Sequence, residues 1–341
     1  MNKNSFIQSL KIAATYIGTV VGAGFATGRE IVEFFTQYGY YGTIGIICSG
    51  ILFTILGIKI MEICSLHRIK NNYEFCILLF GNRFGKVINL IMSLMLIGVA
   101  GVMISGAGAI FSEQLNISRV FGISIFIVLS FLIISRDIKG LHAINSFVVP
   151  LMILFSLSII LLSFNNVNLL FEPQPNSNGF WFTKSLSYVA YNLTLSIAVF
   201  APIASTENNK KILINGSIIG SFGLTVLLLF NHYSISTLPN FNYVQIPTAE
   251  ILHNKFPILH VLFVLVILGE ILTTLVANGF GLVKLMETKM RSNNVSLIII
   301  LVIATSISFF QYKSLLGTIY PAFGALSLLL VIKILYFRNK V

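Results

Sequence analysis

Apolar stretches long enough to cross a bilayer recur along the whole chain, and this repetition constrains the fold more than any other feature. About 20 helical residues are needed to cross roughly 30 Å of hydrocarbon. The pattern predicts ten spans, near residues 9–36, 42–64, 84–112, 119–135, 141–164, 180–205, 211–236, 256–283, 295–311 and 315–336. With 56% hydrophobic and 10% charged residues, the 341-residue chain has too little polar surface to enclose a soluble core. We expect one all-α transmembrane domain over residues 1–341.

The basic residues follow this map of spans. Of the 22 Lys and Arg residues, seventeen fall on the side that would hold both termini, four fall on the other side, and Arg29 lies within the first span. Such a bias marks the cytoplasmic side of a membrane protein. The net charge of +11 therefore predicts topology, with both termini in the cytoplasm and the chain in the cell membrane, and it requires no nucleic-acid partner.

The first span carries an unusual run, "IGTVVGAGFATGRE", at residues 17–30. Its glycines are Gly18, Gly22, Gly24 and Gly28, and glycine costs a helix about 1 kcal/mol relative to alanine. Close packing against another helix is one explanation. A break near Gly22 to Gly24 is the other, because a restarted helix offers N–H groups to an anion and the freed carbonyls offer oxygens to a cation. Glycine-interrupted spans are typical of transporter sites.

A second polar stretch lies half a chain later. The sixth predicted span carries Tyr188, Tyr191 and Asn192, and Asn192 follows Gly22 by 170 residues. The third and eighth spans show a similar offset. Ten helices divided as five plus five predict two halves of opposite orientation, with repeat one over about 7–165 and repeat two over about 180–338. We expect helices 1 and 6 to be broken and to face each other across a cavity.

The glycine run is similar to the first-helix signature of the amino-acid/polyamine/cation superfamily, and is closest to that of the YkvI-like bacterial membrane proteins. The resemblance implies a LeuT-type fold in which backbone near the break holds the substrate. The positions are Val21, Gly22, Ala23, Gly24 and Phe25. It also implies, in many relatives, a sodium ion between the first and eighth helices.

The eighth span contains a carboxylate at Glu270, followed by Thr273 and Thr274 on the same face. A carboxylate in mid-membrane costs about 3 kcal/mol by insertion scales, so such residues commonly carry function. We expect a coupling site for sodium or a proton near Glu270, the two threonines and the carbonyls of Gly18 and Val21. The alternative is a neutral Glu270 that only joins helices.

Three charged residues follow the glycine run. Arg29 and Glu33 are four residues apart and can pair on one helix face, and Glu30 lies between them. They are candidates for a gate, or alternatively for a charge cluster at the outer interface.

These patterns favour a secondary active transporter that takes up a small amino acid or related solute with Na⁺ or H⁺, and no cofactor is expected. A carboxylate suits the restarted helix, and residues 187–206 lack the charged side chains that a strongly charged substrate needs. The alternative is a non-transporting amino-acid sensor similar to the membrane subunits of germinant receptors. No HExxH, GxSxG or Walker motif is present, so an enzyme is not expected.

The topology prediction can be tested by single cysteine substitutions. We expect cysteines at Asn176 and Asn242 to react with a membrane-impermeant thiol reagent applied outside cells, because both positions fall in predicted external loops. Cysteines at Asn71 and Asn208 should not react. The reverse pattern of labelling would contradict both the orientation and the repeat assignment.

Overall fold

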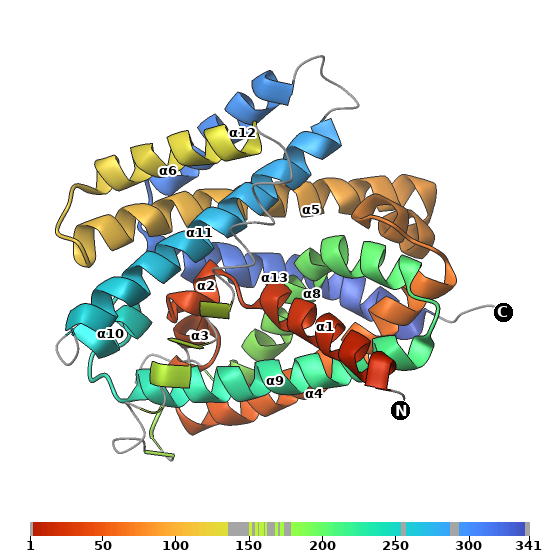
Figure 1. Ribbon diagram of the computed structural model, residues 1–341, viewed down its shortest axis with the longest axis horizontal. Helices are drawn as coiled ribbons and strands as arrows, with labels where there is room; N and C mark the ends of the chain where they lie inside the picture. Colours follow the sequence, from red (N-terminus) through yellow and green to blue (C-terminus); the bar gives the residue numbers. More distant parts are fainter. Residues whose placement is uncertain are drawn as a thin grey trace.

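The computed structural model describes residues 3–135, 179–253, 257–286 and 293–337, together with individual residues between 150 and 173. Within these ranges every regular element is helical (Figure 1). The elements are α1 (Lys3–Val20), α2 (Ala23–Ala26), α3 (Arg29–Phe34), the 3-10 turn η1 (Thr36–Tyr38), α4 (Tyr40–Leu66), α5 (Asn72–Glu113), α6 (Arg119–Ile134), α8 (Trp181–Thr206), α9 (Lys210–Ser236), α10 (Pro247–His253), α11 (Pro257–Met286), α12 (Asn293–Ser308) and α13 (Tyr312–Tyr336).

The helices have the length and surface of membrane spans. Among the described residues, six are long and apolar enough to cross a membrane by length and composition, within α4, α5, α8, α9, α11 and α13. The outer face of α4 exposes Ile44, Ile47, Ile51 and Ile55, each at least 43% accessible. A continuous isoleucine stripe of this kind suits contact with lipid and is unusual on a soluble monomer.

Every predicted span outside residues 141–164 contains a helix of the structure. The predicted fifth span, 141–164, lies largely outside the described residues. The count of ten helices and the five-plus-five repeat therefore stay predictions. The start of α1 and the end of α13 lie at the same end of the molecule (Figure 1).

The prediction of a break in the sixth span is wrong. Helix α8 runs from Trp181 to Thr206 without interruption and contains Pro202 in its last two turns. The polar groups that suggested a break are used within the helix: Asn192 donates to the Tyr188 carbonyl at 3.0 Å, and Ser196 donates to the Asn192 carbonyl at 2.8 Å. These i to i−4 bonds leave the backbone helical, and the stretch contains no glycine.

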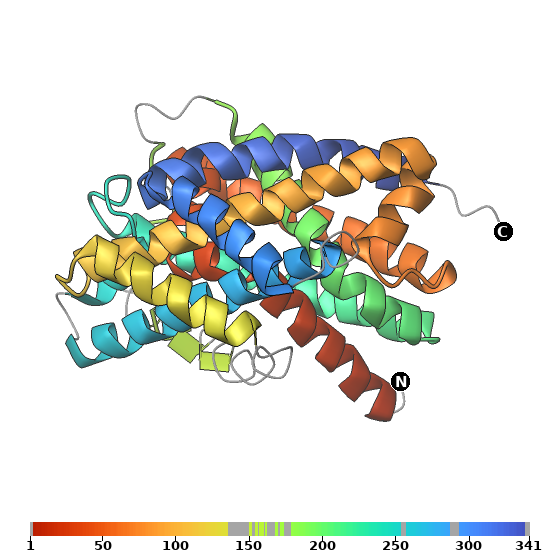
Figure 2. The same cartoon turned by 90° about the horizontal axis from the view of Figure 1, so that it is seen from above.

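The helices form two groups on either side of the short helices α2 and α3. In Figure 1, α6 and α12 lie on one side of the molecule, and α4 and α9 lie on the opposite side. Helix α1 packs on α9 and α4 packs on α8, while α5 contacts α6, α11 and α12. Figure 2 shows the first turns of α1 extending from the body, where Phe6, Ile7 and Leu10 are exposed.

Small residues allow the helices to approach closely. On α9, Cβ atoms added to Gly216, Gly220 and Gly223 would lie within 2.9 Å of side chains of α1. Small residues of α5 have the same packing role. Gly98 meets Phe323 of α13 and Gly101 meets Ile307 of α12, each at less than 3 Å from an added Cβ.

Two pairs of helices have matched lengths. Helices α4 and α9 both contain 27 residues, and α9 begins and ends 170 residues after α4. Helices α6 and α12 both contain 16 residues and are offset by 174. Both offsets are close to the 170 residues that separate Gly22 from Asn192.

A substitution at Gly324 on α13 can test how closely α13 packs against α8. A Cβ at Gly324 would lie 2.6 Å from the backbone oxygen of Ser187, which cannot move away as a flexible side chain can. We expect Gly324→Ala to lower the free energy of unfolding by about 1–3 kcal/mol. The measurement is thermal unfolding of the purified protein in detergent. Gly179→Ala is the matched control, because nothing lies within 4 Å of its added Cβ. Equal stability of the two variants would contradict this packing.

Candidate functional site

The first span is interrupted twice. Helix α1 ends at Val20, and Gly22 is extended, with φ −111° and ψ −169°, before α2 begins at Ala23. The expected break is therefore present, at Val21 and Gly22. A second break follows at Gly28, where φ is +76° and only glycine is accommodated easily, and α3 begins at Arg29. The first span thus consists of one long helix and two short ones.

Helix α11 faces the first break. A Cβ added to Gly22 would lie 3.6 Å from the hydroxyl oxygen of Thr274. Glu270 lies one turn earlier on α11 and is 3% exposed, and its Oε2 has no hydrogen-bond partner among the described residues. The Thr273 hydroxyl donates to the Glu270 carbonyl at 3.0 Å, so it is turned back onto its own helix.

The predicted coupling residues are therefore brought together in part. Thr274 lies close to the break, whereas among the described residues no hydrogen bond joins Glu270 to Gly18 or Val21. Gly18 lies in the last turn of α1, half-buried. In the described part of the chain, no group of three His, Cys, Asp or Glu side chains is placed to hold a metal ion. Sodium binding here stays a prediction.

Glu30 lies on the other side of the break, between α2 and α8. Its Oε1 accepts hydrogen bonds from the Tyr191 hydroxyl at 2.5 Å and from Asn192 Nδ2 at 3.3 Å. Its Oε2 lies over Gly24, where an added Cβ would be only 2.3 Å away. Glycine at position 24 therefore provides the space that the carboxylate occupies. The alternative of an outer charge cluster is wrong for Glu30, which is 2% exposed.

Where a cavity was expected between the first and sixth spans, the structure places the side chain of Glu30. Three of the proposed substrate residues, Gly24, Tyr191 and Asn192, do meet, but they meet around the side chain of Glu30. The side chains of Val21, Ala23 and Phe25 are buried in the surrounding apolar core, with 2% exposure or less. The sequence placed Glu30 with the possible gate residues, and its proximity to α8 was missed because it depends on the second break at Gly28.

Tyrosines complete the wall around Glu30. The Tyr191 ring packs on Tyr320 of α13 at a centroid distance of 4.9 Å, and Tyr188 lies 6.2 Å from Tyr191. Thr27 shares a hydrogen bond with the Tyr312 hydroxyl at 2.9 Å. The two tyrosines of α13 were missed by sequence reasoning, because no spacing along one helix identifies a neighbour from another helix. The hydroxyl of Tyr188 is buried and has no partner among the described residues.

Arg29 points away from Glu30 and fastens the loop that precedes α10. It forms an ion pair with Glu33, as the spacing predicted, and its guanidinium donates to the carbonyls of Phe241, Asn242 and Val244 at 3.0–3.3 Å. Arg29 is 2% exposed, so it does not belong to a solvated charge cluster. The two short helices and the 237–246 loop are therefore joined by charge-assisted hydrogen bonds.

Thr248 at the start of α10 strengthens this connection. Its hydroxyl donates to the Ala26 carbonyl at 2.6 Å and its N–H donates to the Thr27 carbonyl at 3.2 Å. These carbonyls end α2 and lack a partner within it. Helix α10 thus satisfies the backbone groups that the second break leaves free.

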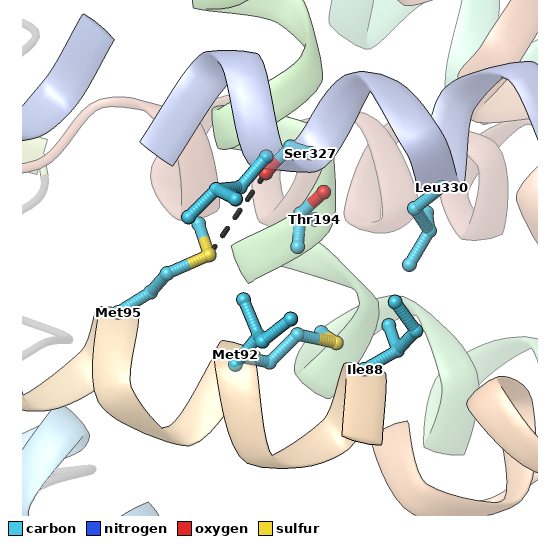
Figure 3. Close-up of a pocket in the computed structure, with 8 residues that line it drawn as sticks. Ile88, Met92, Met95, Thr194, Ser327 and Leu330 are labelled. Atoms are coloured by element: carbon cyan, nitrogen blue, oxygen red, sulfur yellow. Dashed lines mark hydrogen bonds between the residues drawn. The ribbon is translucent and has the colours of Figure 1, made fainter. Parts of the chain in front are cut away.

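The cavity shown in Figure 3 lies elsewhere, between α5, α8 and α13. Its lining includes Met92 and Met95 of α5, Thr194 of α8, and Ser327 and Leu330 of α13. Its volume of about 10 Å³ is room for one water molecule at most. It is too small for an amino acid, so it is not the substrate site.

Comparison with solved structures defines the class of fold. The chain is similar to the inward-facing conformation of Mhp1, with a TM-score of 0.65 and 13% identity, covering 94% of this chain and 73% of that one. It is also similar to MhsT in complex with L-phenylalanine, with a TM-score of 0.62 and 15% identity, covering 90% and 80%. The closed conformation of Mhp1, a nucleobase-cation-symport-1 family transporter, with bromovinylhydantoin bound gives a TM-score of 0.58 at 11% identity, covering 91% of this chain and 74% of that one. The chain is a multi-pass membrane protein with the LeuT-type fold of these transporters.

Sequence comparison then gives the family. The chain is 39% identical over 326 residues to the membrane protein YkvI of Bacillus subtilis (strain 168), covering 93% of this chain and 92% of that protein. It belongs to the same family as YkvI. It is 22% identical to YyaD of the same organism over 94% of both chains. No family model matches the sequence. The expectation that this chain is not an enzyme agrees with these relatives and structures, which are membrane proteins and transporters.

The Arg29–Glu33 pair can be tested by a double-mutant cycle. We expect Arg29→Met to lower the free energy of unfolding by about 3 kcal/mol, because it leaves the Glu33 charge uncompensated in a mostly buried position. The double variant Arg29→Met, Glu33→Gln should recover part of this loss. Thermal unfolding gives the cycle, and hydrogen exchange of residues 241–244 reports the loop. Strictly additive effects with unchanged exchange would show that the pair does not fasten the loop.

Proposed function

We propose that this protein is a secondary active transporter that moves a small amino acid or a related solute across the cell membrane by alternating access, driven by Na⁺ or H⁺. The observation that carries the proposal is the interrupted first helix with buried carboxylates on both sides of it: Glu270 on α11 and Glu30 against α8. Irregular backbone inside an apolar bundle is maintained where it serves a ligand site. The fold shared with Mhp1 and MhsT supports the same function.

The substrate site that we propose consists of the backbone from Val21 to Phe25 and the polar face of α8. The side chains on that face are Tyr188, Tyr191 and Asn192, of which Tyr191 and Asn192 hydrogen-bond Glu30. The MhsT structure carries L-phenylalanine, which supports an amino acid as the class of substrate.

The coupling site that we propose lies on α11. Glu270 is buried and its Oε2 has no hydrogen-bond partner among the described residues, and Thr274 lies close to the break at Gly22. A cation bound by Glu270, Thr273 or Thr274 and by the carbonyls of Gly18 and Val21 would neutralise the carboxylate. Its inward movement supplies about 2.3 kcal/mol per charge at 100 mV. The gate assignment of Arg29, Glu30 and Glu33 is supported for Arg29 by its bonds to carbonyls of the 237–246 loop, and for Glu33 by its ion pair with Arg29.

The inverted repeat that alternating access requires is supported by packing. In the proposed repeat, α1 corresponds to α8 and α4 corresponds to α9. The packing of α1 on α9 then corresponds to the packing of α8 on α4, and the structure contains both contacts. The equal lengths of α4 and α9, and of α6 and α12, agree with this exchange. We also propose membership of the amino-acid/polyamine/cation superfamily, and a cytoplasmic position for both termini on the basis of the positive charges.

The test is uptake by the purified protein in liposomes. Radiolabelled amino acids are added under an inward sodium gradient, an inward proton gradient, or neither. We expect saturable accumulation of at least one amino acid that one of the two gradients drives. Saturable binding without any uptake would favour the sensor alternative, for which the described residues offer no specific support.

In the same assay we expect Glu270→Gln to abolish accumulation driven by the gradient, because the glutamine cannot carry a proton or neutralise a cation. Exchange of substrate across the membrane should persist, since Glu270 lies on α11 and not on the α8 side of the break. Glu62→Gln on α4 is the matched control for the loss of one carboxylate. Accumulation by Glu270→Gln with unchanged sodium and pH dependence would show that coupling occurs elsewhere.

A further inference from the structure

No cationic side chain of the described residues forms an ion pair with Glu30. Among the described residues the only ion pair is Arg29–Glu33, and Arg29 points toward the 237–246 loop. Glu30 is 2% exposed, and in the described part of the chain its carboxylate accepts hydrogen bonds from the neutral side chains of Tyr191 and Asn192. A buried carboxylate in this state requires a proton or a bound cation to offset its loss of hydration.

The place beside Gly24 is also a poor site for a second carboxylate. The sequence suggested that the restarted helix would attract an anion, but α2 contains only four residues and ends at Ala26. Moreover, the Oε2 atom of Glu30 already lies against Gly24. A substrate carboxylate at this position would meet the charge of Glu30 at close range, so the electrostatics here favour a positive group.

The surrounding side chains suit an ammonium group. An ammonium has three N–H donors and needs acceptors. Glu30 offers carboxylate oxygens, and the buried Tyr188 hydroxyl has no partner among the described residues. Tyr188, Tyr191 and Tyr320 form an aromatic wall, with ring centroids 4.9 Å apart for Tyr191 and Tyr320. Aromatic faces attract cations, more strongly where water is excluded.

We propose that Glu30 is the group that binds the ammonium of the substrate, with Tyr188 as a second acceptor, so that the protein selects amine-bearing solutes. The inference rests on the proposed transport function, and it assigns the amino group of the solute to the α8 side of the break. Glu30 is then a specificity residue and differs in role from Glu270, which serves the coupling ion.

The experiment measures binding to the purified full-length protein by isothermal titration and by ligand-induced thermal stabilisation. Its probes are matched pairs: alanine and propionate, leucine and 4-methylpentanoate, phenylalanine and 3-phenylpropionate. The members of each pair differ only in the amino group. We expect the wild-type protein to bind one or more of the amino acids and to bind the des-amino partner about 10- to 100-fold more weakly, as loss of a charge-assisted hydrogen bond requires.

Variants then assign this preference to Glu30. We expect Glu30→Gln to bind the amino acid about 10- to 100-fold more weakly, while its affinity for the des-amino partner is unchanged, so that the preference largely disappears. Glu30→Asp should keep part of the preference, because it retains the charge. Glu62→Gln should behave as wild type, and Glu270→Gln should lose dependence on the coupling ion while keeping the preference for the amine. The unliganded melting temperature of each variant reports whether it is folded.

The outcomes of this experiment distinguish the proposed role of Glu30 from the proposed transport function. An amino acid that binds wild type and Glu30→Gln with the same preference over its des-amino partner would overturn the role of Glu30 and leave the transport proposal intact. Equal binding of both members of a pair by the wild-type protein would do the same. If none of the amino acids binds or is taken up by the wild-type protein, the amino-acid substrate itself is wrong and the role of Glu30 falls with it.

Discussion

Backbone and charged groups inside an apolar bundle must find partners within the protein, because lipid offers no hydrogen bonds. The interrupted first span leaves several such groups without partners in their own helix, and the neighbouring helices and loops supply hydrogen bonds to them. Thr248 of α10 binds the carbonyls of Ala26 and Thr27, and Arg29 binds three loop carbonyls. Tyr191 and Asn192 bind Glu30. The short helices α2 and α3 that flank the second break are therefore held by contacts with α8, α10 and α11. A movement of the short helices would change these contacts.

The two buried carboxylates near the break have different surroundings. Glu270 has one oxygen that meets no partner in the described part of the chain, and it lies on the helix whose Thr274 faces Gly22. Glu30 has two donors on one oxygen and an aromatic wall around it. A compact ion that sheds its water suits oxygen ligands of the first kind, whereas a larger organic cation gains from aromatic faces. The difference in environment supports different ligands for the two residues.

The general architecture could be predicted from the sequence, because hydropathy over about 20 residues determines where a chain crosses a membrane. The break after Val20 and the pairing of Arg29 with Glu33 followed from local spacing in the same way. The break expected in α8 did not occur, since hydrogen bonds from Asn192 and Ser196 to their own helix are as compatible with the residue types as ligand binding. The position of Glu30 depended on the left-handed Gly28, whose φ of +76° redirects the chain by an amount that spacing along a straight helix does not include.

The three glycines after Val21 show why a glycine-rich motif is difficult to interpret from the amino-acid sequence alone. Gly22 is extended, a conformation that other residues also adopt, and a Cβ added to it would lie 3.6 Å from the Thr274 hydroxyl oxygen. Gly24 is helical, and its lack of a side chain makes room for the Glu30 carboxylate. Gly28 alone is required by its backbone angle, and an added Cβ there would also lie 2.6 Å from a methyl group of Thr248. Glycine therefore has three different roles here. Gly22 lies close to α11, Gly24 leaves space for the Glu30 carboxylate, and Gly28 turns the chain into α3. Because each reason involves a different neighbour, a substitution at each glycine disturbs a different contact, and a side chain at Gly24 would displace the Glu30 carboxylate.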